Sequence, residues 1–266
     1  MIRENKIKKK LYAGEPLLMC FLCSNDPNVA ELLVMSGVDI VVIDNEHMLM
    51  DGQQITNIAR AVTSLDGCCM LRTTVKDTCQ IGRFMDCGLS GIVATMTTGY
   101  EAAKAVRDGV KYAPLGKRGL STDGRAAHYG FSGMTPAEYM EFANENTMLF
   151  LTLEDTGAIV ELDKIATLEG IDSIHIGPMD LSNSMGFRGN SQAPEVQALI
   201  KESEKKIASY GNPEGNTWLG AYAPSSDKVK SVVAAGNQVI NIGSELTILA
   251  KGLMAYKEER DACVKK

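Results

Sequence analysis

Aromatic residues make up only 6% of the 266 residues, and the chain has a single tryptophan and three histidines. It also lacks any run near the roughly 20 apolar residues that cross a bilayer, so we expect no membrane association. The basic N-terminus MIRENKIKKK is followed by a short apolar run that Gly14, Glu15 and Pro16 interrupt. This is not the pattern of a secretion signal, and it favours a cytoplasmic protein.

An excess of positive charge is missing too, since the formal net charge is −6 and the sequence pI is about 5.2. Nucleic-acid binders usually carry a basic face, so we expect no nucleic-acid partner. The seven cysteines are odd in number and scattered through apolar segments, which is typical of reduced thiols in the cytosol. Cys20 and Cys23 form a C-x-x-C within LLMCFLC, which we interpret as part of a buried strand.

The sequence contains no G-x-G-x-x-G, no G-x-x-x-x-G-K-[ST] and no H-E-x-x-H. These absences leave no basis for a nucleotide-binding protein or a zinc protease.

Short apolar segments rich in β-branched residues alternate with stretches whose apolar positions recur at helical spacing. Several of the helical stretches end in a glycine just before the next strand, as at Gly37, Gly88, Gly170 and Gly236. The eight candidate strands are residues 17–23, 39–44, 68–73, 90–96, 147–153, 172–177, 217–223 and 237–242.

Strands with few charges that alternate with helices favour a parallel sheet covered on both faces. Eight such units predict the α/β class and a closed TIM (β/α)8 barrel formed by a single domain over residues 1–266, rather than an open doubly wound sheet. A helix over 245–262 closes the chain. Residues 112–134 are the one long interruption, and a loop of this length is more often functional than not.

In such barrels the reactive groups lie at the carboxyl ends of the strands. Glu154 and Asp180 follow two successive candidate strands, so their carboxylates can converge, and two oxygen ligands with open positions suit Mg²⁺ or Mn²⁺. Position alone equally allows one carboxylate to cap a helix while the other is solvated. No lysine lies within a candidate strand, which favours metal chemistry over a Schiff-base mechanism.

Three further polar residues stand at or near the strand ends. Asp44 and His47 are three residues apart, and a carboxylate there could fix the imidazole tautomer and raise its basicity; the alternative is a turn aspartate beside a surface histidine. Arg72 ends an otherwise apolar strand, where it needs a carboxylate partner or an anionic ligand. His175 lies inside an apolar strand, and we expect a hydrogen-bonded core residue.

The chain resembles the metal-dependent pyruvate aldolases of the HpcH/HpaI family, which include the 4-hydroxy-2-oxoheptanedioate and 2-dehydro-3-deoxyglucarate aldolases. The resemblance covers nearly the whole chain, and G-P-x-D-L-S, D-x-E-H and the arginine after the third strand are specific in combination. The segments that carry it, in the family's order, are VVIDNEH, LRTTVKD, DCGLSGIV, APLGKRGLS, LEDTGAIVELDKIATLEGID, HIGPMDLS and PEVQALI.

The resemblance implies a TIM barrel of the PEP/pyruvate-binding type. It also implies a homo-oligomer, commonly a hexamer whose C-terminal helices are exchanged between subunits. Each active site would hold one divalent metal ion, with Mg²⁺ expected and Mn²⁺ or Co²⁺ as alternatives. By position, Glu154 and Asp180 would bind this metal, His47 with Asp44 would be the acid–base pair, and Arg72 would stabilise the pyruvate enolate.

The implied substrate contacts are Thr152, Pro178 and Met179. The implied enzyme is an aldehyde-lyase, a class II pyruvate aldolase that cleaves or forms a 4-hydroxy-2-oxo acid. Pyruvate and an aldehyde are then the small-molecule partners, and the reaction passes through a metal-bound enolate.

Three places depart from the family pattern. Thr152 replaces a glutamine two residues before the metal glutamate, Thr95 replaces a proline, and Met48–Asp51 replaces a Gly-Pro-x-Asp segment. We interpret these changes as altered acceptor specificity. The alternative is a citrate-synthase-like or decarboxylating condensation of oxaloacetate or another 2-oxo acid at the same metal site.

Overall fold

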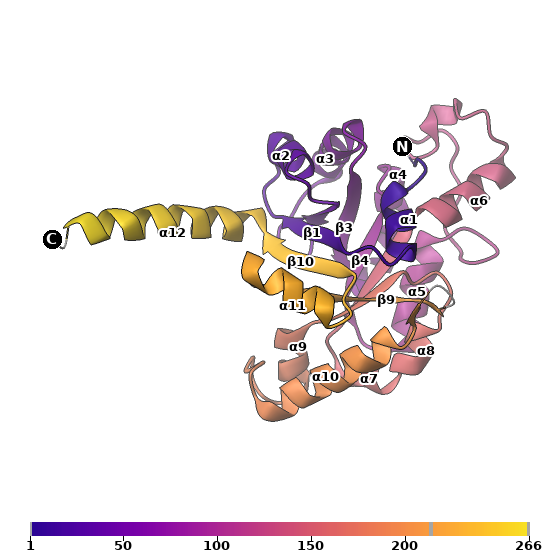
Figure 1. Cartoon of the computed structure of the whole chain (residues 1–266). Helices are drawn as coiled ribbons and strands as arrows, with labels where there is room; N and C mark the ends of the chain where they lie inside the picture. The colour runs from indigo at the N-terminus through magenta and orange to yellow at the C-terminus, as the bar shows by residue number, and fades with distance from the viewer. Residues whose placement is uncertain (1, 213–214, 265–266) are drawn as a thin grey trace.

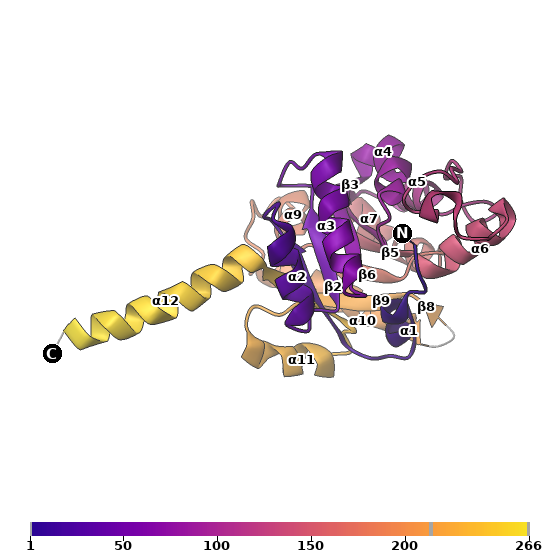
Figure 2. The ribbon, with the colours of Figure 1, turned by 90° about the horizontal axis from the view of Figure 1, so that it is seen from above.

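The structure is a computed structural model that describes residues 2–212 and 215–264. Within these ranges eight parallel strands form a closed barrel in the order β1-β10-β9-β6-β5-β4-β3-β2. Figures 1 and 2 show the barrel and its helices from two sides. The predicted TIM barrel and all eight candidate strands are confirmed. The strands are β1 Leu17–Leu22, β2 Ile40–Asp44, β3 Cys68–Thr74, β4 Gly91–Thr97, β5 Met148–Leu153, β6 Ser173–Ile176, β9 Trp218–Tyr222 and β10 Val239–Ser244.

Helices separate the strands and surround the barrel (Figure 2). None of the helices in the described ranges has the length and apolar character needed to cross a bilayer. Two antiparallel strands of two residues each, β7 Gly211–Asn212 and β8 Gly215–Asn216, precede β9. The helices are α1 Lys6–Tyr12, α2 Pro27–Met35, α3 Gly52–Ser64, α4 Thr78–Asp86, α5 Tyr100–Val110, α6 Pro136–Asn146, α7 Thr156–Val160, α8 Leu162–Ala166, α9 Pro178–Ser184, α10 Pro194–Ala208, α11 Val229–Ala234 and α12 Glu245–Val264.

Most barrel strands are buried on both faces. Side chains such as Leu149 and Leu151 on β5 face the surrounding helices, whereas Met148 and Phe150 join the core inside the barrel. Burial of such side chains contributes about 1.5–3 kcal/mol each. Further along the inward face of β5 the apolar residues give way to Thr152, so the interior becomes polar at its carboxyl end.

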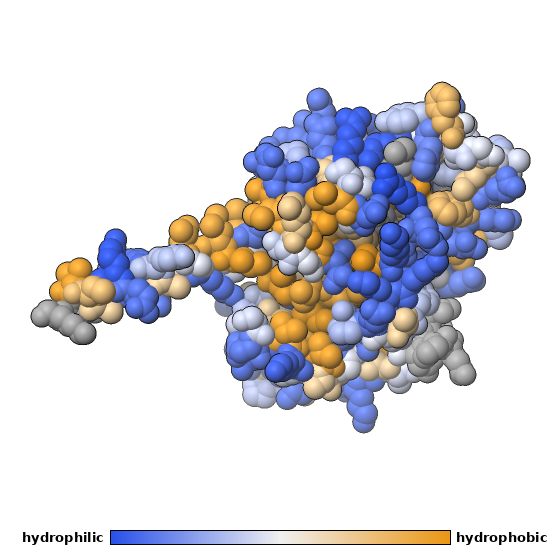
Figure 3. All heavy atoms as spheres, turned by 45° about the horizontal axis from the view of Figure 1, so that its top comes forward, coloured by the Kyte–Doolittle hydropathy of each residue, from blue (hydrophilic) through white to orange (hydrophobic). Residues whose placement is uncertain are grey.

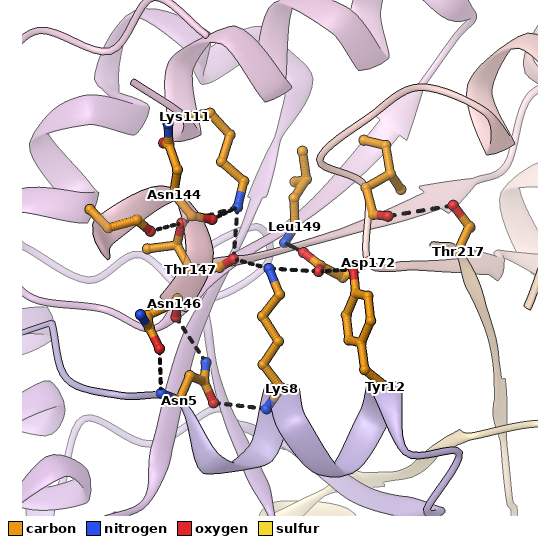
Figure 4. A network of polar contacts seen from close by, with 12 residues as sticks. Asn5, Lys8, Tyr12, Lys111, Asn144, Asn146, Thr147, Leu149, Asp172 and Thr217 are labelled. Atoms are coloured by element: carbon orange, nitrogen blue, oxygen red, sulfur yellow. Dashed lines mark hydrogen bonds and ion pairs between the residues drawn. The ribbon is translucent and has the colours of Figure 1, made fainter. Parts of the chain in front are cut away.

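Helix α1 closes the amino end of the barrel. Its Leu11 is fully buried and packs in the same cluster as Leu17, Met148 and Trp218. On the polar side of the helix, Lys8 Nζ lies 3.0 Å from Asp172 Oδ1, within the network of Figure 4. The basic N-terminal segment of the sequence is thus a plug for the barrel.

The long loop over 112–134 also packs near this end, between α5 and α6. Tyr112 stacks edge-on against Tyr139 of α6, and Ala126 and Ala127 pack with Ile2. His128 Nε2 lies 2.7 Å from the carbonyl oxygen of Ile2. Within one chain, the loop is therefore held by contacts with α6 and the N-terminus rather than by catalytic side chains.

Lys111 is a buried lysine that connects this loop to the residues just before β5. Its Nζ lies within hydrogen-bond distance of the carbonyl oxygens of Asn144 and Thr147, 2.8 Å in both cases, as drawn in Figure 4. Replacement of Lys111 by methionine removes the donor to the Asn144 carbonyl oxygen, whereas the Thr147 carbonyl oxygen keeps its contact with Lys8 Nζ at 3.0 Å. We expect the free energy of unfolding to fall by about 3 kcal/mol in chemical denaturation.

Burial lowers the pKa of Lys111 to about 7, although the charge of Asp172 opposes the shift. Between about pH 7 and the ordinary lysine pKa of 10.5, Lys111 is protonated in the unfolded chain but not in the folded protein. The lysine's contribution to stability therefore rises with pH across this window, and the deficit of the variant should grow. The exposed Lys117 is the matched control, and an equal loss in Lys117→Met would contradict the assignment.

Candidate active site at the carboxyl end of the barrel

A cavity of about 260 Å³ opens at the carboxyl ends of the barrel strands. All of the predicted site residues except Asp44 line it. These residues are His47, Arg72, Thr152, Glu154, Pro178, Met179 and Asp180.

Glu154 follows β5, and Asp180 lies in the first turn of α9, just past β6. Glu154 is 8% exposed, and its Oε1 accepts a hydrogen bond from the backbone N–H of Met96. A Cβ on Gly177 would lie 2.5 Å from Glu154 Oε2. The lack of a side chain at Gly177 therefore leaves room for the Glu154 carboxylate.

The electrostatics of Glu154 favour a cation nearby. Burial raises its pKa to about 7, and the negative charges of Glu46 and Asp180 add to this effect, whereas the Met96 N–H and Arg72 oppose it. A buried carboxylate that faces other carboxylates is stabilised in its charged form by a divalent ion.

The donor set fits Mg²⁺ or Mn²⁺, which bind carboxylates and keep further positions for water and substrate. Across residues 2–212 and 215–264, no three His, Cys, Asp or Glu side chains gather into a closed cation site. In the open site that the sequence predicts, Glu154 and Asp180 would be the two protein ligands, and substrate would supply other oxygens.

Asp44 pairs with Arg72 rather than with the imidazole of His47. The two residues are register partners on β2 and β3, and Arg72 donates to both carboxylate oxygens, from Nε at 3.0 Å and from Nη2 at 2.7 Å. His47 contacts Asp44 through its backbone N–H, which donates to Asp44 Oδ1 at 3.2 Å. The side-chain pair of Asp44 and His47 that the sequence spacing predicted is therefore replaced by an ion pair of Asp44 and Arg72.

The arginine in turn is held in one orientation. Its guanidinium carbon lies 4.3 Å from the ring centre of Phe21. Burial acts to raise the pKa of Asp44, but hydrogen bonds and charge from Arg72, with the N–H groups of His47 and Glu46, hold it below its ordinary value. Asp44 is therefore a charged support for Arg72.

Glu46 is a site residue that the sequence reasoning missed. Its Oε2 lies 3.6 Å from His47 Nε2 and 3.4 Å from Arg72 Nε. The His47 side chain is 63% exposed at the cavity mouth, whereas Glu46 is 11% exposed. The signal was present as the D-x-E-H segment, in which Glu46 is the carboxylate next to the histidine.

The three departures from the family pattern fall in two regions. Thr152 and Thr95 line the cavity. Leu49 in the Met48–Asp51 segment is almost fully exposed, and Asp51 caps α3. Only the two threonines are therefore placed to contact a bound molecule within this chain.

The barrel with its rim of carboxylates beside Arg72 defines a class of protein, an α/β barrel with a polar cavity at the carboxyl ends of its strands. Residues 17–251 match the family model described as HpcH/HpaI aldolase/citrate lyase. The chain belongs to this family, and the predicted family resemblance is confirmed.

Two relatives with curated names are aldolases, that is, aldehyde-lyases. The chain is 33% identical over 250 residues to a hydroxypyruvate/pyruvate aldolase of Pseudomonas aeruginosa, covering 94% of this chain and 90% of the relative. It is 29% identical over 253 residues to a 4-hydroxy-2-oxo-heptane-1,7-dioate aldolase of Escherichia coli, covering 95% and 93%. A solved HpcH/HpaI aldolase of Desulfitobacterium hafniense superposes with a TM-score of 0.82 at 25% identity, covering 96% of this chain and 98% of that one.

Proposed function

We propose that the protein is a divalent-cation-dependent pyruvate aldolase that cleaves or forms 4-hydroxy-2-oxo acids. The observation that carries this proposal is the placement of Glu154, Asp180 and Arg72 around one cavity. A 2-oxo acid has two adjacent oxygen-bearing carbons, which suit a cation on one side and a guanidinium on the other.

A bound Mg²⁺, Mn²⁺ or Co²⁺ ion would supply Lewis-acid polarisation of the keto group, with Mg²⁺ as the expected ion. Arg72, fixed by Asp44, offers its guanidinium to the oxyanion of the enolate. The backbone at Pro178 and Met179 lies along the cavity, where it can border the carboxylate. His47 at the mouth would take the proton from a 4-hydroxyl and return it.

The decisive experiment follows the methyl protons of pyruvate by NMR in deuterated water. With Mg²⁺, Mn²⁺ or Co²⁺ we expect exchange that EDTA abolishes and added cation restores. Release of pyruvate from a 4-hydroxy-2-oxo acid should respond in the same way. Exchange that persists in chelator would exclude the cation mechanism, and oxaloacetate as donor or acceptor separates an aldolase from a citrate-type condensation.

We also propose that the chain forms a homo-oligomer through α12. This helix projects away from the barrel (Figures 1 and 2), and Glu245 anchors its start by accepting from the backbone N–H groups of Cys23 and Ser24. Leu249 and Leu253 are 59% and 60% exposed. Figure 3 shows apolar surface that continues from the base of the helix onto the barrel, as expected for an interface.

Exchange of α12 between subunits would cover these side chains, and the family resemblance favours a hexamer. The double variant Leu249→Glu and Leu253→Glu should sediment as a smaller species than the wild type, because charges oppose burial at the interface. Val160→Glu, which alters an exposed valine on α7, is the control. A wild-type monomer in sedimentation velocity would refute the assembly.

A cytoplasmic location is part of the same proposal. All seven cysteines are free thiols, which supports a reducing compartment.

A further inference from the structure

The floor of the cavity contains a histidine that the proposed mechanism does not use. His175 points inward from β6, is 7% exposed, and lines the cavity together with Thr152 and Glu154. Sequence reasoning predicted a core residue with its hydrogen bonds satisfied. In the structure the ring is buried in the barrel wall and also lines the bottom of the cavity.

The contacts of His175 favour one position for the proton on its ring. The hydroxyl of Ser173 donates to the carbonyl oxygen of Trp218 at 2.9 Å, so its lone pairs face His175 Nε2, 3.4 Å away. Nε2 is then the N–H donor, and Nδ1 keeps an unshared lone pair. In the part of the chain that is described, Nδ1 has no hydrogen-bond partner.

The ring is neutral and fixed in position. Burial lowers the pKa of His175 to about 4. Its ring centre lies 5.8 Å from that of Phe150, and a Cβ on Gly220, its register partner on β9, would lie 2.1 Å from His175 Cε1. Glycine at position 220 therefore leaves room for the imidazole. The packing holds Nδ1, the acceptor atom, in a fixed position.

We propose that His175 is a specificity-determining residue, whose Nδ1 accepts a hydrogen bond from a hydroxyl on C3 of the 2-oxo acid. The smallest such substrate is hydroxypyruvate. This assignment rests on the proposed function and adds the class of donor that the site prefers.

The chemistry of the ring selects a hydroxyl among the groups of a 2-oxo acid. Keto and carboxylate oxygens only accept hydrogen bonds, as Nδ1 does, so they gain nothing there. They are also the groups that Arg72, and a cation held at the acidic rim, would attract. C3 is the remaining carbon of a three-carbon donor. His175 lies two residues before Gly177 along the chain, about 6.6 Å deeper in the barrel than the rim.

The first test compares donors by deuterium exchange at C3 with Mg²⁺ present. The measured quantity is the ratio of kcat/KM for hydroxypyruvate to that for pyruvate, which cancels general losses. In His175→Phe, which cannot accept a hydrogen bond, we expect this ratio to fall by about tenfold or more, because a site built to bind a hydroxyl discriminates through it. His175→Gln retains an acceptor and should restore part of the ratio.

The matched control is His128→Phe, the same substitution at the loop histidine outside the cavity, which should keep the wild-type ratio. An unchanged ratio in folded His175→Phe would overturn the assignment of His175 while the proposed aldolase function stands. Absence of exchange of either donor by the wild type would instead remove the proposed function itself.

A second measurement needs no altered side chain in the site. In protein labelled with ¹⁵N-histidine, the Nδ1 resonance of His175 should shift when hydroxypyruvate and Mg²⁺ are added, because a hydrogen bond forms to its lone pair. Pyruvate and Mg²⁺ should leave it in place. Equal shifts with both donors, or a resonance typical of an Nδ1–H tautomer, would contradict the assignment even if His175→Phe failed to fold.

Discussion

Replacement of Glu154 by glutamine is expected to slow cation-dependent exchange of pyruvate protons by about 10³-fold. The substitution keeps the size of the side chain but removes the negative charge that faces Asp180. It should also weaken cation binding in calorimetry, because one of two charged oxygen donors is lost.

The control is Asp163→Asn, which removes a carboxylate from the exposed surface of α8 and should leave exchange unchanged. Circular dichroism should show that Glu154→Gln remains folded, since a neutral side chain at 154 relieves the charge crowding with Glu46 and Asp180. A variant that keeps wild-type cation affinity and exchange would place the cation elsewhere.

Replacement of Arg72 by methionine should have two separable effects. Asp44 is 2% exposed, and without its bidentate partner it becomes an unpaired buried charge, which costs about 3–5 kcal/mol of stability. Exchange should also fall by about 10²-fold or more, because the positive charge that faces the oxyanion is lost.

The double variant Arg72→Met with Asp44→Asn separates these effects. Without the unpaired carboxylate, the free energy of unfolding should recover most of its loss in chemical denaturation. Exchange should stay low, because the guanidinium is still missing. Recovery of both stability and exchange would mean that Arg72 serves only to neutralise Asp44.

The strands and the acidic rim could be predicted because they depend on local patterns. Short, nearly continuous apolar runs between helical stretches mark the strands, and chain order alone brings Glu154 and Asp180 to the same end of a parallel barrel. The confirmed barrel therefore follows from the repeat of strand and helix.

The partners of the site residues could not be predicted in the same way. Asp44 and His47 are close in sequence, whereas the partner that Asp44 contacts, Arg72, stands opposite it in the register of β2 and β3. The same holds for His175, whose environment depends on Gly220 across the β6–β9 ladder. Spacing along one strand carries no information about cross-strand register.

The plug formed by α1 has a kinetic consequence. Leu11 fills the amino end of the barrel, so traffic of small molecules passes through the mouth beside His47. A donor seated against His175 then has to arrive before the aldehyde and depart after it. In the cleavage direction, pyruvate should therefore inhibit competitively against the 4-hydroxy-2-oxo acid. The aldehyde should inhibit noncompetitively against the same substrate.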